Sequence, residues 1–554
     1  MIKRLLTPLL FPLLLLSCKT EKKPETTERA QQENDLADIS TKEIEFKVLD
    51  SKVIDNNVLW EPFEADLADF DQEQHDVLSP IILEKSIPEI QQAVKSGKLT
   101  YEELVKFYLF RIKTFDRNNE KSLNSVIALN PNVLAEARQL DKQGGEWDDH
   151  SLYGMPILLK DNINTAGMPT TAGAVALSDN QTEDAFITKK LKENGALILG
   201  KANLSEWAYF FCGDCPSGYS AVGGQTLNPY GRKILDTGGS SSGSGVATAA
   251  NFAVAAVGTE TSGSILSPSS ANSVVGLKPT IGLLSRGGIV PISSTLDTPG
   301  PMTKNVIDNA IMLDALIGLD AADSASFKSG EFAETSTYAD AIRQVEPETF
   351  LAEKRLGYYK NYEDSLYGQA IQTLREAGAT LVEIERDTTI NLPNFLRVLN
   401  LDMKKDLPDY IKNYGGKNLQ VSDVETVTTF NKEDSLIRML YGQRLFYGIV
   451  ADSATDAEFT AIKDTLQING RKFFDNPMQA NDLDAVLSIN NYMAGFAAVA
   501  KYPALTVPMG YTNENRPMGL TLIAPSKSEG LLLQLGYAYE QLSQQRKMPE
   551  LYSN

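Results

Sequence analysis

The sequence has few of the residues on which several common kinds of site depend. Only two histidines occur among its 554 residues, His75 and His150, and only three cysteines. No motif built on them implies a metal or an organic cofactor. Basic residues are fewer than acidic ones, 52 against 72, so the net charge is −20. Because so acidic a chain repels nucleic acid and anionic surfaces, we expect small molecules or peptides as partners and no nucleic acid.

The sequence also lacks an internal linker. No Pro- or Ser-rich stretch divides it after about residue 85, which favours one large domain over 86–545. Between residues 124 and 200, short apolar runs alternate with helical patterns, and this alternation predicts an α/β fold with helices packed on a largely buried sheet. The predicted strands are 125–129, 156–159 and 196–199, and the predicted helices are 135–140 and 184–194.

The first eighteen residues have the features of a targeting segment. Lys3 and Arg4 precede an apolar run that ends at Leu16, which is too short to span a bilayer comfortably. The letters LLSC that end at Cys18 resemble a bacterial lipobox. We therefore expect a lipoprotein signal peptide at 1–18, a lipidated Cys18, and a protein held in the bacterial cell envelope, facing the periplasm. An ordinary signal peptide with an incidental cysteine is the alternative.

Residues 19–41 are rich in Glu, Lys, Thr and Gln and have almost no large apolar side chains, which predicts a disordered tether. The lipid anchor would then be the only contact with a membrane. Residues 42–85 mix acidic residues with scattered aromatics and support no structural prediction. Two capping boxes follow, Ser86 to Glu89 and Thr100 to Glu103, and each predicts the start of a helix.

The most unusual stretch is 238–268, GGSSSGSGVATAANFAVAAVGTETSGSILSP, in which two Gly/Ser clusters enclose a run of small residues. Glycine allows close backbone approach, and a Ser cluster before an Ala-rich helix indicates a helix N-terminus with outward N–H groups. The second cluster follows an apolar run, 252–257, that is typical of a buried strand. It is therefore expected at a strand end, where sites are commonly built.

This stretch resembles the amidase signature family, whose members carry a GGSSxGS-like cluster followed by GT[DE]xxGSI. The resemblance implies that Ser264 is the nucleophile and that Ser240, held by a cis peptide, is the second serine. The third catalytic residue would be Lys160, in the motif GMPILLKDN at 154–162. A lone lysine at such a strand end would by default extend its amine to solvent. If it is buried instead, its pKa falls and a neutral amine can accept a proton.

The same resemblance implies the fold and the activity. It implies a central mixed β-sheet flanked by helices on both faces, and a Ser-Ser-Lys triad that hydrolyses a carboxylic amide through an acyl-enzyme, releasing ammonia or an amine. The oxyanion would be held by backbone N–H groups of Thr261, Ser262, Gly263 and Ser264. The motif has Leu266 where the family often has Arg, a form similar to the peptide amidase branch. A C-terminally amidated peptide or a simple primary amide is the leading substrate. Residues 320–484, where the resemblance fades, are expected to shape the acyl pocket.

Three other interpretations stay open. Residues 239–243 fit the G-x-S-x-G motif of an α/β-hydrolase with Ser241 as nucleophile, but that fold places its His after the Ser, and both histidines here precede it. A non-catalytic envelope binding protein that kept the fold is the second. The third, the amidase subunit of a tRNA-dependent amidotransferase, is disfavoured by the export signal and the acidity.

Cys212 and Cys215 form a C-x-x-C motif, which is found in redox pairs and in zinc sites. Zinc would need further ligands, and only Cys18 and the two histidines could supply them. A thioredoxin-like role would place the motif at a helix start in a small βαβ domain. Two loop thiols that pair in an oxidising envelope are the favoured interpretation.

Overall fold

A computed structural model describes residues 43–55, 58–117, 120–145, 147–328, 337–360 and 365–553. The predicted signal peptide, the lipidation of Cys18 and the tether lie outside the described residues. The chain from Glu43 onward forms one compact unit.

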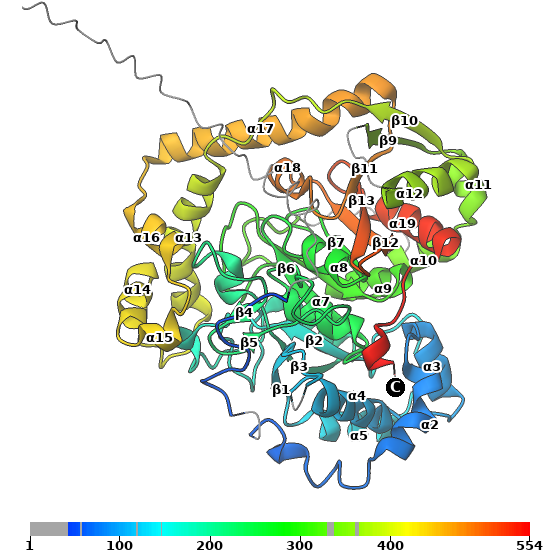
Figure 1. Cartoon of the computed structure of the whole chain (residues 1–554), viewed down its shortest axis with the longest axis vertical. Helices are drawn as coiled ribbons and strands as arrows, with labels where there is room; N and C mark the ends of the chain where they lie inside the picture. The colour runs from blue at the N-terminus through cyan, green and yellow to red at the C-terminus, as the bar shows by residue number, and fades with distance from the viewer. Residues whose placement is uncertain are drawn as a thin grey trace, which may run out of the picture. The chain divides into compact units, whose positions relative to one another are not determined.

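The centre of this unit is an 11-stranded sheet in the order β1-β3-β2-β6-β8-β7-β12-β13-β11-β9-β10, while β4 and β5 pair separately. It contains both parallel and antiparallel pairs, so the predicted mixed sheet is confirmed. In Figure 1 the sheet runs from β1 near the bottom to β10 near the top. In chain order the strands are β1 (Val126–Leu129), β2 (Pro156–Lys160), β3 (Leu197–Ala202), β4 (Tyr219–Ser220), β5 (Gly224–Gln225), β6 (Ala255–Glu260), β7 (Val275–Lys278), β8 (Thr298–Thr303), β9 (Arg355–Tyr359), β10 (Thr380–Ile384), β11 (Ala485–Ile489), β12 (Ala504–Tyr511) and β13 (Pro517–Ile523).

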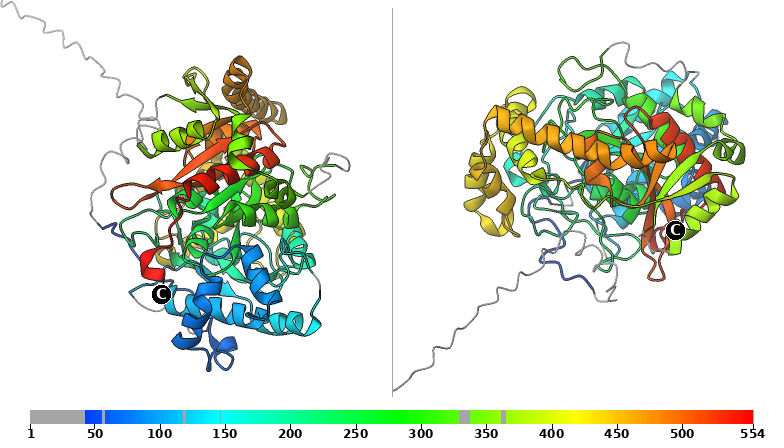
Figure 2. Two further views of the ribbon diagram at one scale, coloured as in Figure 1. Left: turned by 90° about the vertical axis from the view of Figure 1, so that its right-hand side faces the viewer. Right: turned by 90° about the horizontal axis from the view of Figure 1, so that it is seen from above.

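Helices cover both faces of the sheet (Figures 1 and 2), as the sequence predicted. The helices are η1 (Glu61–Phe63), α2 (Gln72–Ile82), α3 (Ile87–Lys95), α4 (Tyr101–Phe115), α5 (Val133–Gln143), η2 (Val175–Leu177), α6 (Phe186–Glu193), η3 (Glu206–Tyr209), α7 (Ser242–Ala249), α8 (Leu266–Ala271), α9 (Val306–Leu316), α10 (Tyr338–Arg343), α11 (Pro347–Ala352), α12 (Ser365–Glu376), α13 (Phe395–Tyr414), α14 (Val424–Lys432), α15 (Ser435–Arg438), α16 (Arg444–Ala451), α17 (Asp456–Asn481), α18 (Ala494–Ala500), α19 (Glu529–Ser543) and η4 (Glu550–Tyr552).

Two neighbouring strands position the candidate site. β2 pairs in parallel with β6, with Leu159 opposite Val257. Every residue of both strands is buried, which explains their near-continuous apolar sequences. Since parallel strands end at the same edge of a sheet, the last residue of β2, Lys160, comes close to Thr259 near the end of β6.

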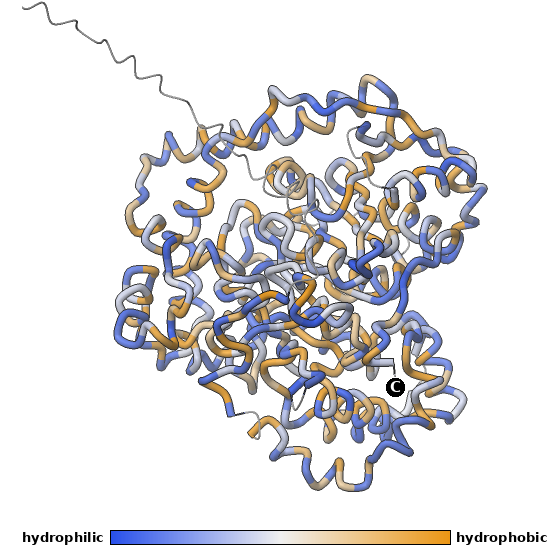
Figure 3. The backbone as a smooth tube through the Cα atoms, in the orientation of Figure 1, coloured by the Kyte–Doolittle hydropathy of each residue, from blue (hydrophilic) through white to orange (hydrophobic). Residues whose placement is uncertain are grey.

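The helices α13 to α16 lie together beside the sheet, and α17 crosses above it (Figure 1). The buried residues of α17 recur at helical spacing, and in Figure 3 its tube carries both hydrophobic and hydrophilic segments. No helix in the described part of the chain is both long enough and apolar enough to cross a membrane.

Some elements differ from the sequence-based expectation. The pattern of residues 436–450 taken alone predicts one helix, but the structure has a turn and an irregular segment at 439–443 that separate α15 from α16. Residues 42–85, for which no structure was predicted, contain η1 and α2. The capping box of α2 joins Asp71 and Gln74, and Phe63 and Ile82 are buried against the main core.

Candidate active site

Lys160 lies at the end of β2 with its amine in a closed polar pocket. Its side chain is 0% exposed. Its Nζ donates hydrogen bonds to Ser240 Oγ at 2.7 Å, to Thr259 Oγ1 at 2.8 Å and to Thr259 O at 3.2 Å. Burial lowers the pKa of Lys160 to about 7, because removal from water disfavours the charged amine more than the nearby carboxylates of Asp297 and Glu260 favour it. A large fraction of Lys160 is therefore neutral near pH 7.

Ser240 contacts this amine directly, and the segment of Ser264 is bonded to the residue that follows Ser240. The Gly239–Ser240 peptide is cis, as the family resemblance implied, and the Ser240 side chain is fully buried. The N–H of Ser241 donates to the carbonyl oxygen of Ser264 at 3.1 Å, which joins the two serine segments directly. Ser264 is half-buried and is thus the more accessible of the two serines. The structure brings the three sequence-predicted residues, separated by up to 104 positions between Lys160 and Ser264, into one site.

Two residues of the site were not singled out by sequence reasoning, although both lie inside the motifs that indicated it. Thr259 Oγ1 accepts hydrogen bonds from Lys160 and, at 3.0 Å, from Asn162 Nδ2. Asn162 is the final residue of the GMPILLKDN motif. Thr259 therefore holds the amine of Lys160 against Ser240, and Asn162 holds Thr259.

The loop before Ser264 is organised by the buried carboxylate of Glu260. Glu260 Oε1 accepts from the N–H of Gly263 at 2.7 Å, and Oε2 accepts from Ile265 at 2.7 Å and from Leu266 at 3.0 Å. The N–H of Gly263 is therefore bonded to Glu260, while the role of this loop in holding an oxyanion stays a prediction. Gly263 has φ +88°, a conformation that favours glycine.

The other three N–H groups assigned to the oxyanion remain available. Among the described residues, the N–H groups of Thr261, Ser262 and Ser264 donate to no protein acceptor. The Thr261 hydroxyl donates to Asp297 Oδ1 at 2.5 Å, which ties this loop to the segment after β7. Preorganised backbone donors of this kind stabilise a negative oxygen strongly in a site that excludes water.

We predict that Glu260→Ala lowers both stability and turnover. The change leaves three N–H groups without their acceptor, and each buried donor left unpaired costs about 1–3 kcal/mol. For three donors the lower end of this range predicts that the free energy of unfolding falls by about 3 kcal/mol or more. Denaturant unfolding of wild type and variant measures the change. An unfolding free energy within 0.5 kcal/mol of wild type, as for ordinary surface substitutions, would contradict this role for Glu260.

The geometry does not favour Ser241 as nucleophile. Its hydroxyl is fully buried, donates to Thr259 O at 3.1 Å and accepts from the Thr259 N–H at 3.2 Å. Both histidines lie elsewhere. His75 stacks on Phe107 in the N-terminal helices, and His150 contacts Asp148. Ser241 therefore has a structural role in holding the end of β6.

Cys212 and Cys215 are joined in a disulfide, in agreement with the favoured interpretation of the C-x-x-C motif. The two residues are buried and belong to a hydrophobic cluster that includes Trp207 and Phe446. The bond therefore closes a loop packed on the helices α13 to α16.

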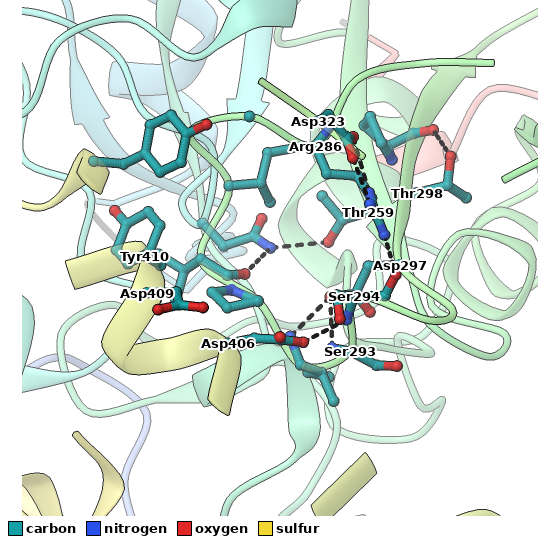
Figure 4. Close-up of a pocket in the computed structure, with 18 of the residues that line it drawn as sticks. Thr259, Arg286, Ser293, Ser294, Asp297, Thr298, Asp323, Asp406, Asp409 and Tyr410 are labelled. Atoms are coloured by element: carbon teal, nitrogen blue, oxygen red, sulfur yellow. Dashed lines mark hydrogen bonds and ion pairs between the residues drawn. The ribbon is translucent and has the colours of Figure 1, made fainter. Parts of the chain in front are cut away.

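A cavity of about 270 Å³ adjoins the site (Figure 4). It is lined by Asn162, Thr259 and Thr261 on the catalytic side, and by Asp406 and Tyr410 of α13 on the other. Residues 322–324 also line it, so the segment 320–484, for which sequence predicted a role in the substrate pocket, contributes to its wall. This arrangement provides an accessible serine, a buried neutral amine and a volume for a substrate side by side.

Comparison with known proteins agrees with this chemistry. The family model described as Amidase matches residues 103–533. A probable amidase of Arabidopsis thaliana is 34% identical over 488 residues, which cover 85% of this chain and 92% of the plant protein. The crystal structure of an amidase family protein from Bacillus anthracis superposes with a TM-score of 0.85 at 38% identity, covering 92% of this chain and 99% of that one. The native peptide amidase of Stenotrophomonas maltophilia gives a TM-score of 0.78 at 37% identity, with 84% and 98% covered. The chain therefore belongs to the amidase signature family and is an amidase family enzyme.

Proposed function

We propose that this enzyme hydrolyses a carboxylic amide with Ser264 as nucleophile, Ser240 as proton relay and Lys160 as base. The observation that carries the proposal is the 2.7 Å contact between Lys160 Nζ and Ser240 Oγ in a fully buried pocket adjacent to Ser264. Its pKa of about 7 gives Lys160 the neutral form that a base requires.

The reaction follows from these roles. Lys160 takes a proton from Ser240, and Ser240 takes a proton from Ser264. The oxygen of Ser264 attacks the amide carbonyl at the same time. The C–N bond then breaks, and the relay returns the proton to the departing amine or ammonia. Water attacks the acyl-enzyme and gives up a proton to the same relay, which releases the carboxylic acid and restores Ser264.

The N–H groups of Thr261, Ser262 and Ser264 are proposed to hold the oxygen that becomes negative in each step. One such donor is typically worth about 2.7–4 kcal/mol of transition-state stabilisation. Glu260 orients the loop that carries them, because its carboxylate fixes the N–H groups on either side of Ser264.

We propose a peptide amide or another simple primary amide as the substrate, which the similarity to a peptide amidase supports. Ammonia release from a panel of peptide, amino-acid, aromatic and fatty amides tests this. We expect turnover of at least one amide class and the largest kcat/KM for peptide amides. Well-folded protein that hydrolyses no amide and reacts with no serine-directed probe would favour the binding-protein interpretation instead.

We further propose that Cys18 is lipidated and anchors the enzyme in the cell envelope, which the lipobox-like sequence before it supports. Cys18→Ala is expected to block lipidation, so that the protein no longer partitions into detergent. Mass spectrometry of the mature N-terminus, with phase partitioning of wild type and variant, measures both effects. A mature wild-type protein that begins elsewhere and carries no acyl chain would refute the anchor.

A further inference from the structure

The cavity beside the catalytic serines has one wall formed by a single face of α13. The residues are Asp406, Asp409, Tyr410, Asn413 and Tyr414, at the i, i+3, i+4, i+7 and i+8 spacing of one helix face. In Figure 4 the labelled Asp406, Asp409 and Tyr410 of this helix lie across the cavity from Thr259 and Asp297. A group bound here would therefore lie beside Thr259, whose side chain contacts Lys160.

The charges of the cavity do not balance. Arg286 and Asp323 neutralise each other, since the guanidinium Nε donates to Asp323 Oδ2 at 2.9 Å and Nη2 donates to Oδ1 at 2.5 Å. The carboxylates of Asp297, Asp406 and Asp409 remain, and in the described part of the chain none of the three forms an ion pair with Lys or Arg. The cavity is therefore lined by carboxylic groups without a basic partner on the side of Thr261.

An independent observation points to a ligand with N–H donors. Asn162 lines the same cavity and is only 2% exposed. Its Nδ2 is bonded to Thr259, but its Oδ1 has no hydrogen-bond partner among the described residues. Because a buried acceptor without a partner is destabilising, a donor supplied by a substrate would bind favourably there.

Two further features of the wall suit a cation. The rings of Tyr410 and Tyr414 both line the cavity and lie 6.3 Å apart, and aromatic faces attract ammonium and guanidinium groups. Burial and the neighbouring Asp402 raise the pKa of Asp406 to about 7, and burial also raises the pKa of Asp297. A bound cation would stabilise both carboxylates in their charged forms.

We infer that this cavity is a subsite for a cationic group, an ammonium or guanidinium, carried on the acyl part of the substrate. The inference rests on the proposed amide hydrolysis and specifies its substrate class. A volume of about 270 Å³ suits one side chain or one amino terminus more than a large ligand, since ligand pockets usually measure about 300–1,000 Å³.

The test compares two primary amides whose side chains share the same four-carbon chain, N-acetyl-lysine amide, which ends in an ammonium, and N-acetyl-norleucine amide, which is uncharged, in EDTA at about pH 8.5. At this pH Asp406 is ionised and the substrate amine, with a pKa near 10.4, is still charged. We expect kcat/KM to be about tenfold higher for the lysine amide. The double variant Asp406→Asn/Asp409→Asn should bring the ratio close to one, mainly through KM.

Two control variants distinguish an effect of the charge in the cavity from an effect of the substitutions on folding. The double variant Asp456→Asn/Asp464→Asn, at two exposed positions of α17, also removes two carboxylates but outside the cavity, and it should keep the tenfold ratio. Asp409→Glu keeps the charge in place and should retain most of the ratio. A wild-type ratio near one, or a ratio that the double variant leaves unchanged, would overturn the inference.

Equilibrium binding of both amides to the Ser264→Ala protein makes the same comparison without turnover. Tighter binding of the lysine amide supports the subsite even if wild type hydrolyses neither compound, in which case the proposed hydrolysis fails and the subsite stands. Equal affinities overturn the subsite, whatever the activity of the wild type.

Discussion

Ser264→Ala is expected to abolish both turnover and labelling by a fluorophosphonate probe. Ser264 is half-buried, follows the N–H donors of its loop and lies beside Ser240, so its oxygen is the one placed to attack a carbonyl. Loss of a serine nucleophile lowers kcat by about 10⁶-fold in a serine protease, and a loss of similar size is expected here. Ammonia release and intact-protein mass after labelling measure the two effects.

Ser241→Ala is the matched control, because it removes a hydroxyl from the same Gly/Ser stretch. The Ser241 hydroxyl is buried and bonded on both sides to Thr259, so the variant should lose some stability and still take the label. Attachment of the probe to Ser241 in wild type, or normal labelling of Ser264→Ala, would assign the chemistry to an α/β-hydrolase-like serine and remove the amidase mechanism.

The sequence was sufficient to indicate the candidate catalytic residues, because they lie in short motifs. Lys160 ends a strand of apolar residues, and Ser264 follows another, so burial pattern and motif indicate the same edge of the sheet. The sequence shows neither that these two strands pair nor which contact holds the amine. Thr259 holds Lys160 through one side-chain oxygen and one carbonyl oxygen. The spacing of apolar residues along the sequence does not indicate such hydrogen bonds.

The opposite wall of the cavity could not be derived from local sequence. The pattern of Asp406, Asp409 and Tyr410 is compatible with any solvent-facing helix surface, and only the packing of α13 turns it toward residues more than 100 positions earlier.

The N-terminal helix α2 is a different case. Its Asp71 to Gln74 segment matches a capping box, so that signal was present in the sequence and was missed.

The oxyanion loop shows why a motif does not settle the role of each of its atoms. Four consecutive residues were predicted to donate, yet the N–H of Gly263 is bonded to the carboxylate of Glu260. A side chain three residues earlier in the chain competes for that donor, and its conformation depends on burial in the sheet. The family resemblance indicated the loop, and the structure shows that the N–H of Gly263 is bonded while those of Thr261, Ser262 and Ser264 have no protein acceptor among the described residues.

Lys160→Ala is expected to reduce kcat by about 10³-fold or more, since a positioned base contributes about 10²–10⁴-fold. In the wild type the neutral amine is the active form, and the folded-state pKa of Lys160 is lowered to about 7. Activity should therefore be full above this pKa and should fall as the pH drops through it. Ammonia release between about pH 5 and pH 10 gives the profile, and Lys160→Ala should lack this acid limb.

Controls are needed because a histidine, with an ordinary pKa near 6.5, would give an acid limb at almost the same pH. His75→Gln and His150→Gln should leave the limb in place, since both side chains lie outside the site. Lys160→Arg should not restore activity, because a guanidinium stays protonated. Lys160→Met fills the same volume without an amine, so it should fold and remain inactive. If Lys160→Met or Lys160→Ala turns over amides at nearly the wild-type rate, the relay has no base, and the Ser-Ser-Lys mechanism is wrong at its first step.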